Sequence, residues 1–221
     1  MAYKSLLTVA TRGDRCELAI TGAAAIATAH DAHLDILALG VDVTQIGYSY
    51  IGSGAVILQA TLDRTEQEAK EIEKAARKAL AEQDPTLRYA LEAAVTQLGA
   101  LTELVAQRAR FADLVVLPRP YGPGSGTESE AVVEAALFEG HAPVLILPDS
   151  GAGHAAAPRR VVIAWNQSAE AMAAVRKALP ILKQADLVSI TVIDPPQTGV
   201  ERSDPGGMLC QMLVRHGVKA E

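Results

Sequence analysis

Apolar and polar positions alternate along the chain in blocks of two kinds, and these blocks predict the secondary structure. Short apolar runs rich in valine and leucine predict strands buried on both faces, and longer blocks with helical periodicity predict helices. The predicted strands lie at 5–10, 33–41, 89–96, 113–118 and 143–147, and the predicted helices at 16–30, 56–83, 98–110 and 127–140. This alternation predicts an α/β domain over residues 1–149, with a doubly wound five-stranded parallel sheet of Rossmann-like type.

After a linker of small residues at 150–158 the same pattern begins again. LLTVAT at 6–11 has a counterpart in VVIAWN at 161–166, and LALGVD at 37–42 has one in ITVID at 190–194. Predicted strands lie at 160–165 and 186–193, and predicted helices at 168–182 and 206–216. Residues 159–221 therefore form a partial second repeat, βαβα only, in which Trp165 is expected to pack in the core.

Composition and charge narrow the class of protein. A net charge of −6 argues against a nucleic-acid surface, because phosphate backbones need a clustered positive field. No window approaches the roughly 18 apolar residues of a membrane helix, so we expect no membrane partner. Cys16 and Cys210 lie far apart without metal-site spacing, which favours reduced core thiols and a cytoplasmic location.

A glycine-rich loop between the strand at 113–118 and the helix from Thr127 is where we expect any ligand. Gly122, Gly124 and Gly126 punctuate this loop, with Ser125 between the last two. In an open parallel sheet, ligands lie at the carboxyl ends of the strands, beside the loops that open helices. Thr127 is expected to cap its helix, whose first turn also carries Glu128 and Glu130.

The segments DLVVLP at 113–118 and AVVEAALFEGHAPVLILP at 131–148, together with the loop between them, resemble the universal stress protein family. VVIAWNQSAEAMAAVRKALPIL at 161–182 looks like the opening of a second family domain. The resemblance implies a tandem universal stress protein with a truncated second domain. It also implies a stress-response role and ATP as the ligand, bound by a GxxGx9G[ST] loop and an aspartate after the first strand.

This sequence departs from the ATP-binding pattern of that family. The loop glycines stand at alternate positions, and Thr11 and Asn166 stand where the two domains would carry the aspartate. Glu128 and Glu130 would repel a triphosphate, since two unit charges at about 4 Å cost about 4 kcal/mol at an effective dielectric of 20. We therefore predict a loop degenerate for ATP in the first unit and none in the second.

Three functional hypotheses remain open at this stage. The first is a non-catalytic protein that senses an adenine nucleotide or related anion and signals through assembly. The second is a structural interaction module without ATP, and the third is a weak ATP hydrolase. No P-loop, GxSxG elbow or HExxH motif supports catalysis or a metal site. The predicted binding residues are Thr11, Val41, Gly122, Gly124, Ser125, Gly126 and Thr127.

The last strand of the first unit, from Pro143 to Leu147, is predicted to lie at an edge of the sheet. An apolar edge strand with unpaired backbone groups invites pairing with another chain. We therefore predict a homodimer formed through this edge.

Overall fold

The computed structural model describes residues 2–43, 54–122, 125–149, 158–193 and 204–221. The chain divides into two compact units, one of Tyr3–Gly153 and the other of His154–Glu221 with Met1–Ala2. No helix among the described residues is both long enough and apolar enough to cross a bilayer.

The first unit alternates strands and helices as the sequence predicts. Its elements are β1 (Ser5–Ala10), α1 (Gly13–His30), β2 (His33–Asp42), α2 (Gly54–Ala81), β3 (Arg88–Gln97), α3 (Leu98–Ala109), β4 (Leu114–Pro118), α4 (Thr127–Glu134), a π-helical turn η1 (Ala135–Glu139) and β5 (Val144–Leu147). The strands pair in the order β3-β2-β1-β4-β5, and all neighbours are parallel. The predicted α/β class and five-stranded parallel sheet are confirmed.

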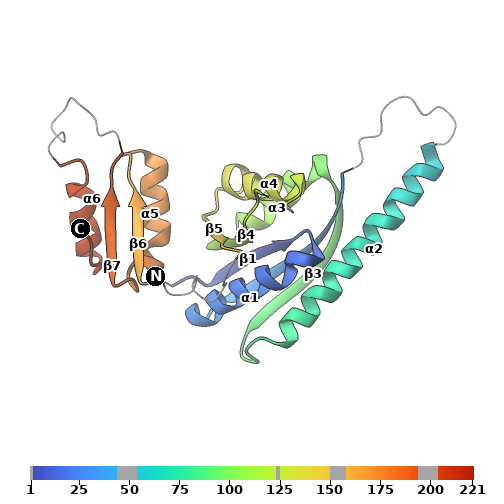
Figure 1. Ribbon diagram of the computed structural model, residues 1–221, viewed down its shortest axis with the longest axis horizontal. Coiled ribbons are helices and arrows are strands. Elements are labelled where there is room, and N and C mark those ends of the chain that lie inside the picture. The colour runs from blue at the N-terminus through green and yellow to red at the C-terminus, as the bar shows by residue number, and fades with distance from the viewer. Residues whose placement is uncertain (1, 44–53, 123–124, 150–157, 194–203) are drawn as a thin grey trace. The chain divides into compact units, whose positions relative to one another are not determined.

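Helices cover both faces of this sheet (Figure 1). α1 and α2 pack against each other and on one face, and α3 and α4 lie on the other. β1 and β4 are buried except for one half-buried residue at an end of each, as their continuous apolar runs predict. One core cluster joins alternate residues of β1, β2 and β4, such as Leu7, Leu37 and Val115, to Leu101 and Val105 of α3.

A close approach fixes α1 against the edge of the sheet. Gly22, in the middle of α1, faces the side chain of Leu147 in β5, and a Cβ atom at Gly22 would collide with the leucine methyl groups. Leu147 is fully buried by this contact. The glycine is therefore needed for the space it leaves, and it sets where α1 lies along β5.

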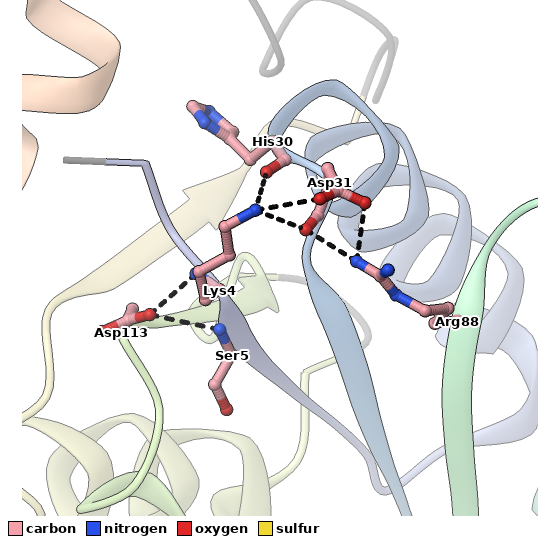
Figure 2. Close-up of polar contacts among 6 residues, drawn as sticks. All are labelled: Lys4, Ser5, His30, Asp31, Arg88 and Asp113. Carbon is pink, nitrogen blue, oxygen red and sulfur yellow. Dashed lines mark hydrogen bonds and ion pairs between the residues drawn. The ribbon is translucent and has the colours of Figure 1, made fainter.

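A polar network ties together the amino ends of the strands (Figure 2). The Asp113 carboxylate accepts hydrogen bonds from the backbone N–H groups of Lys4 and Ser5, at 2.8 and 3.1 Å. The Lys4 ammonium and the Arg88 guanidinium both bind Asp31, at 3.0 and 2.6 Å from its two carboxylate oxygens. The network lies at the end of the sheet opposite to the glycine-rich loop, and its role is structural.

The second unit contains β6 (Arg160–Ala164), α5 (Ala169–Leu182), β7 (Leu187–Thr191) and α6 (Gly207–Arg215), with β6 and β7 parallel. Trp165 packs in its core cluster, as predicted. Sequence analysis missed one feature. The chain beyond α6 returns to β7, where Val188 N–H donates to the Lys219 carbonyl at 2.8 Å and Ile190 N–H donates to that of Glu221 at 2.8 Å. The second unit thus has a short third parallel segment beside β7.

Two smaller expectations need correction, and others lie outside the described residues. Thr127 is the first residue of α4 and does not cap it; Gly126 holds the N-cap position and α4 has no side-chain cap. Cys16 is a buried core thiol, whereas Cys210 is only partly buried. Most of the predicted linker at 150–158 lies outside the described residues.

Candidate functional site

A pocket opens at the carboxyl ends of β1 and β4, beside the first turns of α1 and α4. It is shallow, with a cavity volume of about 20 Å³, far below the range of about 300–1,000 Å³ for ligand sites, so only part of a ligand would fit inside it. Apolar side chains of the strands and α4, including Val9, Leu117 and Val132, form its walls. Its polar lining comes from Thr11, Arg12 and Arg15 after β1 and from Ser129 in α4. The pocket therefore lies where ligands of parallel sheets bind.

Two helices begin beside this pocket without a side-chain cap. Arg12 is the N-cap of α1 and Gly126 that of α4, both with extended backbone, and neither residue has a side-chain acceptor that could cap the first turn. The first backbone N–H groups of a helix point outward and favour negative charge. Both first turns carry acids instead, Asp14 in α1 and Glu128 and Glu130 in α4. The partial positive charge of each helix end is thus met by the chain's own carboxylates.

Arg12 and Asp14 form an ion pair at the mouth of the pocket. Arg12 Nε and Nη2 donate to the two Asp14 carboxylate oxygens at 3.0 and 2.9 Å. These hydrogen bonds, more than any other interaction, lower the pKa of Asp14 below its usual value. The same bonds raise the pKa of Arg12, with a further contribution from Glu128. Both groups are therefore charged at neutral pH.

A second group of charges joins α1 to the loop after β4 and to Asp149, the second residue after β5. Arg15 Nη1 donates to the Arg119 backbone carbonyl at 2.7 Å. Arg119 Nη2 lies 3.0 Å from Asp149 Oδ2, and Arg15 Nη1 lies 3.9 Å from Asp149 Oδ1. Three guanidinium groups and three carboxylates (those of Asp14, Glu128 and Asp149) thus meet around this end of the sheet.

The structure places five of the predicted site residues around this same end of the sheet. Thr11 lines the pocket directly. Gly122 has φ +109°, a conformation that strongly favours glycine, so it makes the turn after Arg119. The Ser125 hydroxyl donates to the Arg119 carbonyl at 3.4 Å. Gly126 and Thr127 begin α4, whose Ser129 lines the pocket.

Of the remaining two predicted residues, one lines a different hollow and the other is not described by the structure. Val41, near the end of β2, lines a separate hollow with Thr61 and Arg64 of α2. Gly124 lies outside the described residues.

Sequence analysis missed the charged residues of the site. Arg12, Arg15, Arg119 and Asp149 each stand within five residues of a strand's carboxyl end, in TRGDR, PRP and PDS. Because parallel strands end at the same edge, this placement was a usable signal.

No arrangement for nucleophilic or metal chemistry accompanies the pocket within the described ranges. No three His, Cys, Asp or Glu side chains gather there so as to hold a metal ion. Cys16, near the pocket in sequence, is fully buried in α1, and burial raises the pKa of its thiol to about 11. The Cys16 thiol is therefore protonated at neutral pH and is a packing residue.

Known proteins resemble this chain in fold. No protein-family model matches the chain and no curated protein matches it in sequence. Among solved structures, a universal stress protein from Archaeoglobus fulgidus DSM 4304 aligns over 98% of this chain and 76% of its own, with a TM-score of 0.59 and 13% identity.

Two further structures align over 66% of this chain and 98% of their own. One is the universal stress protein UspA from Lactobacillus plantarum, with a TM-score of 0.48 and 20% identity. The other is a universal stress protein in complex with cAMP, with a TM-score of 0.41 and 19% identity. On the Archaeoglobus alignment, the described chain has the α/β fold of the universal stress proteins.

Proposed function

We propose that this protein is a non-catalytic stress-response protein that binds an adenine nucleotide or a related phosphate-bearing molecule and signals through self-association. The observation that carries the proposal is the pocket between β1 and β4. There Arg12 and Arg15 and the hydroxyl of Ser129 meet beside two helix N-termini. Guanidinium groups and helix N-termini both recognise phosphate.

The charge balance favours a ligand with one phosphate over a triphosphate. Each guanidinium at the site is accompanied by a carboxylate, and Glu128 lies against Gly126 at the start of α4. A triphosphate would bring three or four negative charges close to these acids, each pair costing about 4 kcal/mol at about 4 Å and an effective dielectric of 20. A single phosphate group would have to displace, or bind beside, only one of these carboxylates.

The first test is the identity of the bound molecule. Mass spectrometry of the small molecules released on denaturing fresh protein should find a nucleotide or related phosphate ester. Calorimetry with ATP, ADP, AMP, cyclic AMP and inorganic phosphate, each with and without Mg²⁺, should rank the one-phosphate ligands first. An empty protein that binds none of these would contradict the proposal.

A charge variant locates the site. Ser129→Asp places a carboxylate in the pocket, and ligand affinity should fall by at least roughly tenfold because charged hydrogen-bond partners contribute about 1.5–3 kcal/mol. Thr102→Asp is the matched control, since it adds the same charge at an exposed position early in α3. Equal affinity of the two variants would place the ligand elsewhere.

The proposed self-association uses β5. β5 lies at one edge of the sheet, and Ile146 is 38% exposed there. Val95 in β3, the other edge strand, is 39% exposed and provides a matched position. Light scattering at tens of micromolar should show a dimer that Ile146→Lys disrupts and Val95→Lys does not. A wild-type monomer would contradict this part of the proposal.

A second candidate is an interaction module that binds no nucleotide. The carboxylates that already meet the arginines and helix ends favour it. Absence of bound nucleotide together with an intact dimer would select it. A weak ATP hydrolase is the third candidate, and Mg²⁺-dependent phosphate release that Ser129→Asp abolishes would select that one.

A further inference from the structure

The Asp149 carboxylate lies between two arginines that come from different parts of the chain. Arg119 follows β4, and Arg15 belongs to the first turn of α1. Their guanidinium nitrogens lie 3.0 and 3.9 Å from the two oxygens of Asp149, the second residue after β5. One carboxylate thus meets two converging positive charges, as a bound anion would.

Arg15 is held in place before any ligand arrives. Its Nη1 donates to the Arg119 carbonyl at 2.7 Å, and its side chain is only 18% exposed. A guanidinium has five N–H donors, so it can bond more than one partner at a time. Because Arg15 also lines the pocket, its charge serves both the pocket and Asp149.

The turn at Gly122 brings the chain back against Arg119. The Arg119 guanidinium lies close to Gly122, whose φ of +109° produces the turn, and Ser125 N–H donates to the Gly122 carbonyl at 3.1 Å. The Arg119 backbone is thus bonded by Arg15 and by the Ser125 hydroxyl, while its side chain remains 50% exposed. Arg119 can therefore change its partner without disturbing the strand.

The ion pair between Asp149 and Arg119 is weak enough to be exchanged. Asp149 is 44% exposed, and ion pairs at exposed positions contribute only about 0–1 kcal/mol. Phosphate offers more acceptor oxygens and more negative charge than a carboxylate, and arginine binds both with the same fork of donors. A phosphate would therefore replace Asp149 at little cost.

We propose that Arg15 and Arg119 are the phosphate-holding pair of this site and that the Asp149 carboxylate occupies the pair when no ligand is bound. Asp149 is then a built-in competitor that sets the affinity. The inference rests on the proposed function, because it names the groups that hold the phosphate of the ligand.

Calorimetry of the full chain with inorganic phosphate at low ionic strength tests the inference. Asp149→Asn keeps the size of the side chain and removes the competing charge, so affinity should rise about two- to fivefold, the equivalent of an exposed ion pair. Arg119→Gln should lower affinity by at least roughly tenfold. In Asp149→Asn/Arg119→Gln, the gain from the first change should vanish.

Asp63→Asn is the matched control, because it removes the same charge from an exposed residue of α2 that bonds Gln59. If Asp149→Asn and Asp63→Asn bind phosphate equally, or if Arg119→Gln binds as the wild type does, the inference is overturned while the proposed function stands. If the wild type and all variants bind neither phosphate nor nucleotide, the proposed function itself fails. Should Asp149→Asn fold poorly by circular dichroism, Asp149→Ser replaces it with the same expected gain.

Discussion

The two units open with the same three elements but bury them very differently. β1 pairs with β2 on one side and β4 on the other, whereas β6 pairs with β7 alone among the described strands. The register makes Leu7 equivalent to Val162, since Ser5 pairs with His33 and Arg160 with Leu187. Leu7 is 3% exposed and Val162 is 68% exposed. The same apolar pattern is thus a core strand in one unit and an edge strand in the other.

The ends of these two strands differ as well. Ala10 and Thr11 line the pocket of the first unit. At the equivalent position to Ala10 the second unit has Trp165, which packs in the core and donates from Nε1 to the Pro205 carbonyl at 3.2 Å. There the helix is also capped, because Ser168 accepts from Ala171 N–H. The first unit thus has its pocket beside a small residue and an uncapped helix, and the second unit has a large residue and a capped helix at the equivalent place.

Hydrogen exchange should show the largest difference between the units. We expect backbone amides of β6 and β7 to exchange at least about tenfold faster than those of β1 and β2, because the second sheet is narrow and less buried. Mass spectrometry of peptic peptides measures this directly. Equal protection in both units would mean that burial by β4, α3 and α4 is not what distinguishes them.

Truncation at the equivalent positions of the two strands sharpens the comparison. Leu7→Ala should lower the free energy of unfolding of the first unit by about 3 kcal/mol, since it leaves a cavity in the core. Val162→Ala removes an exposed side chain and should change stability by less than about 0.5 kcal/mol. Urea unfolding, followed by hydrogen exchange in peptides that contain β1 and in peptides that contain β6, measures the effect on each unit separately. Similar costs would show that Val162 is covered in solution.

A single hydroxyl tests the contribution of β4. Thr8 Oγ1 donates to the Val116 carbonyl at 2.8 Å inside the first sheet, where the second unit has Ile163. Thr8→Val keeps the volume and loses this bond, so the free energy of unfolding should fall by about 1 kcal/mol. The urea midpoint gives the change, and Ser189→Ala, which removes an exposed hydroxyl from β7, is the control.

A buried histidine should give the first unit a small dependence of stability on pH. His30 is 6% exposed, its ring meets Tyr3 at 5.0 Å, and its Nε2 has no partner among the described residues. Burial, followed by the positive charge of Lys4, lowers the pKa of His30. The neutral ring is thus favoured in the folded state. Its contribution is complete above the unfolded pKa of about 6.5 and declines as the pH falls from there towards the lowered folded pKa.

His30→Gln should reduce that decline, because a glutamine side chain carries no titratable group in this pH range. Urea midpoints at pH 7.5 and pH 5.5 measure the difference between wild type and variant. An unchanged pH dependence would assign it to other groups.

Most of the fold followed from periodicity alone. The apolar runs that predict β1, β2, β4 and β5 are strands of the sheet, and each differs from its prediction by a residue or two at most. The short segment at Lys219–Glu221 was missed because three residues carry no period, and only its backbone bonds to β7 define it. The cap at Thr127 was wrong because Gly126 takes the N-cap position one residue earlier.

The sequence indicated where the candidate site lies better than it indicated which residues form it. The carboxyl ends of parallel strands pointed to Thr11 and to the first turn of α4, which flank the pocket. The arginines were not found, because whether Arg15 turns into a pocket or into solvent depends on contacts with Arg119, about a hundred residues away along the sequence. Such contacts leave no local pattern.

The close packing of Gly22 on Leu147 has a consequence for how ligand binding would depend on the concentration of the protein itself. α1 carries Arg15 at one end and Gly22 near its middle, so one rigid helix touches both the pocket and the edge strand β5. If the pocket binds a ligand and the edge strand binds a second copy of the chain, both binding equilibria involve α1. Thermodynamic reciprocity then requires that a ligand that tightens the dimer is itself held more tightly by the dimer, by the same factor. The fraction of protein with ligand bound would thus depend on the concentration of the protein as well as on that of the ligand. The contact at Gly22 would couple the two binding equilibria.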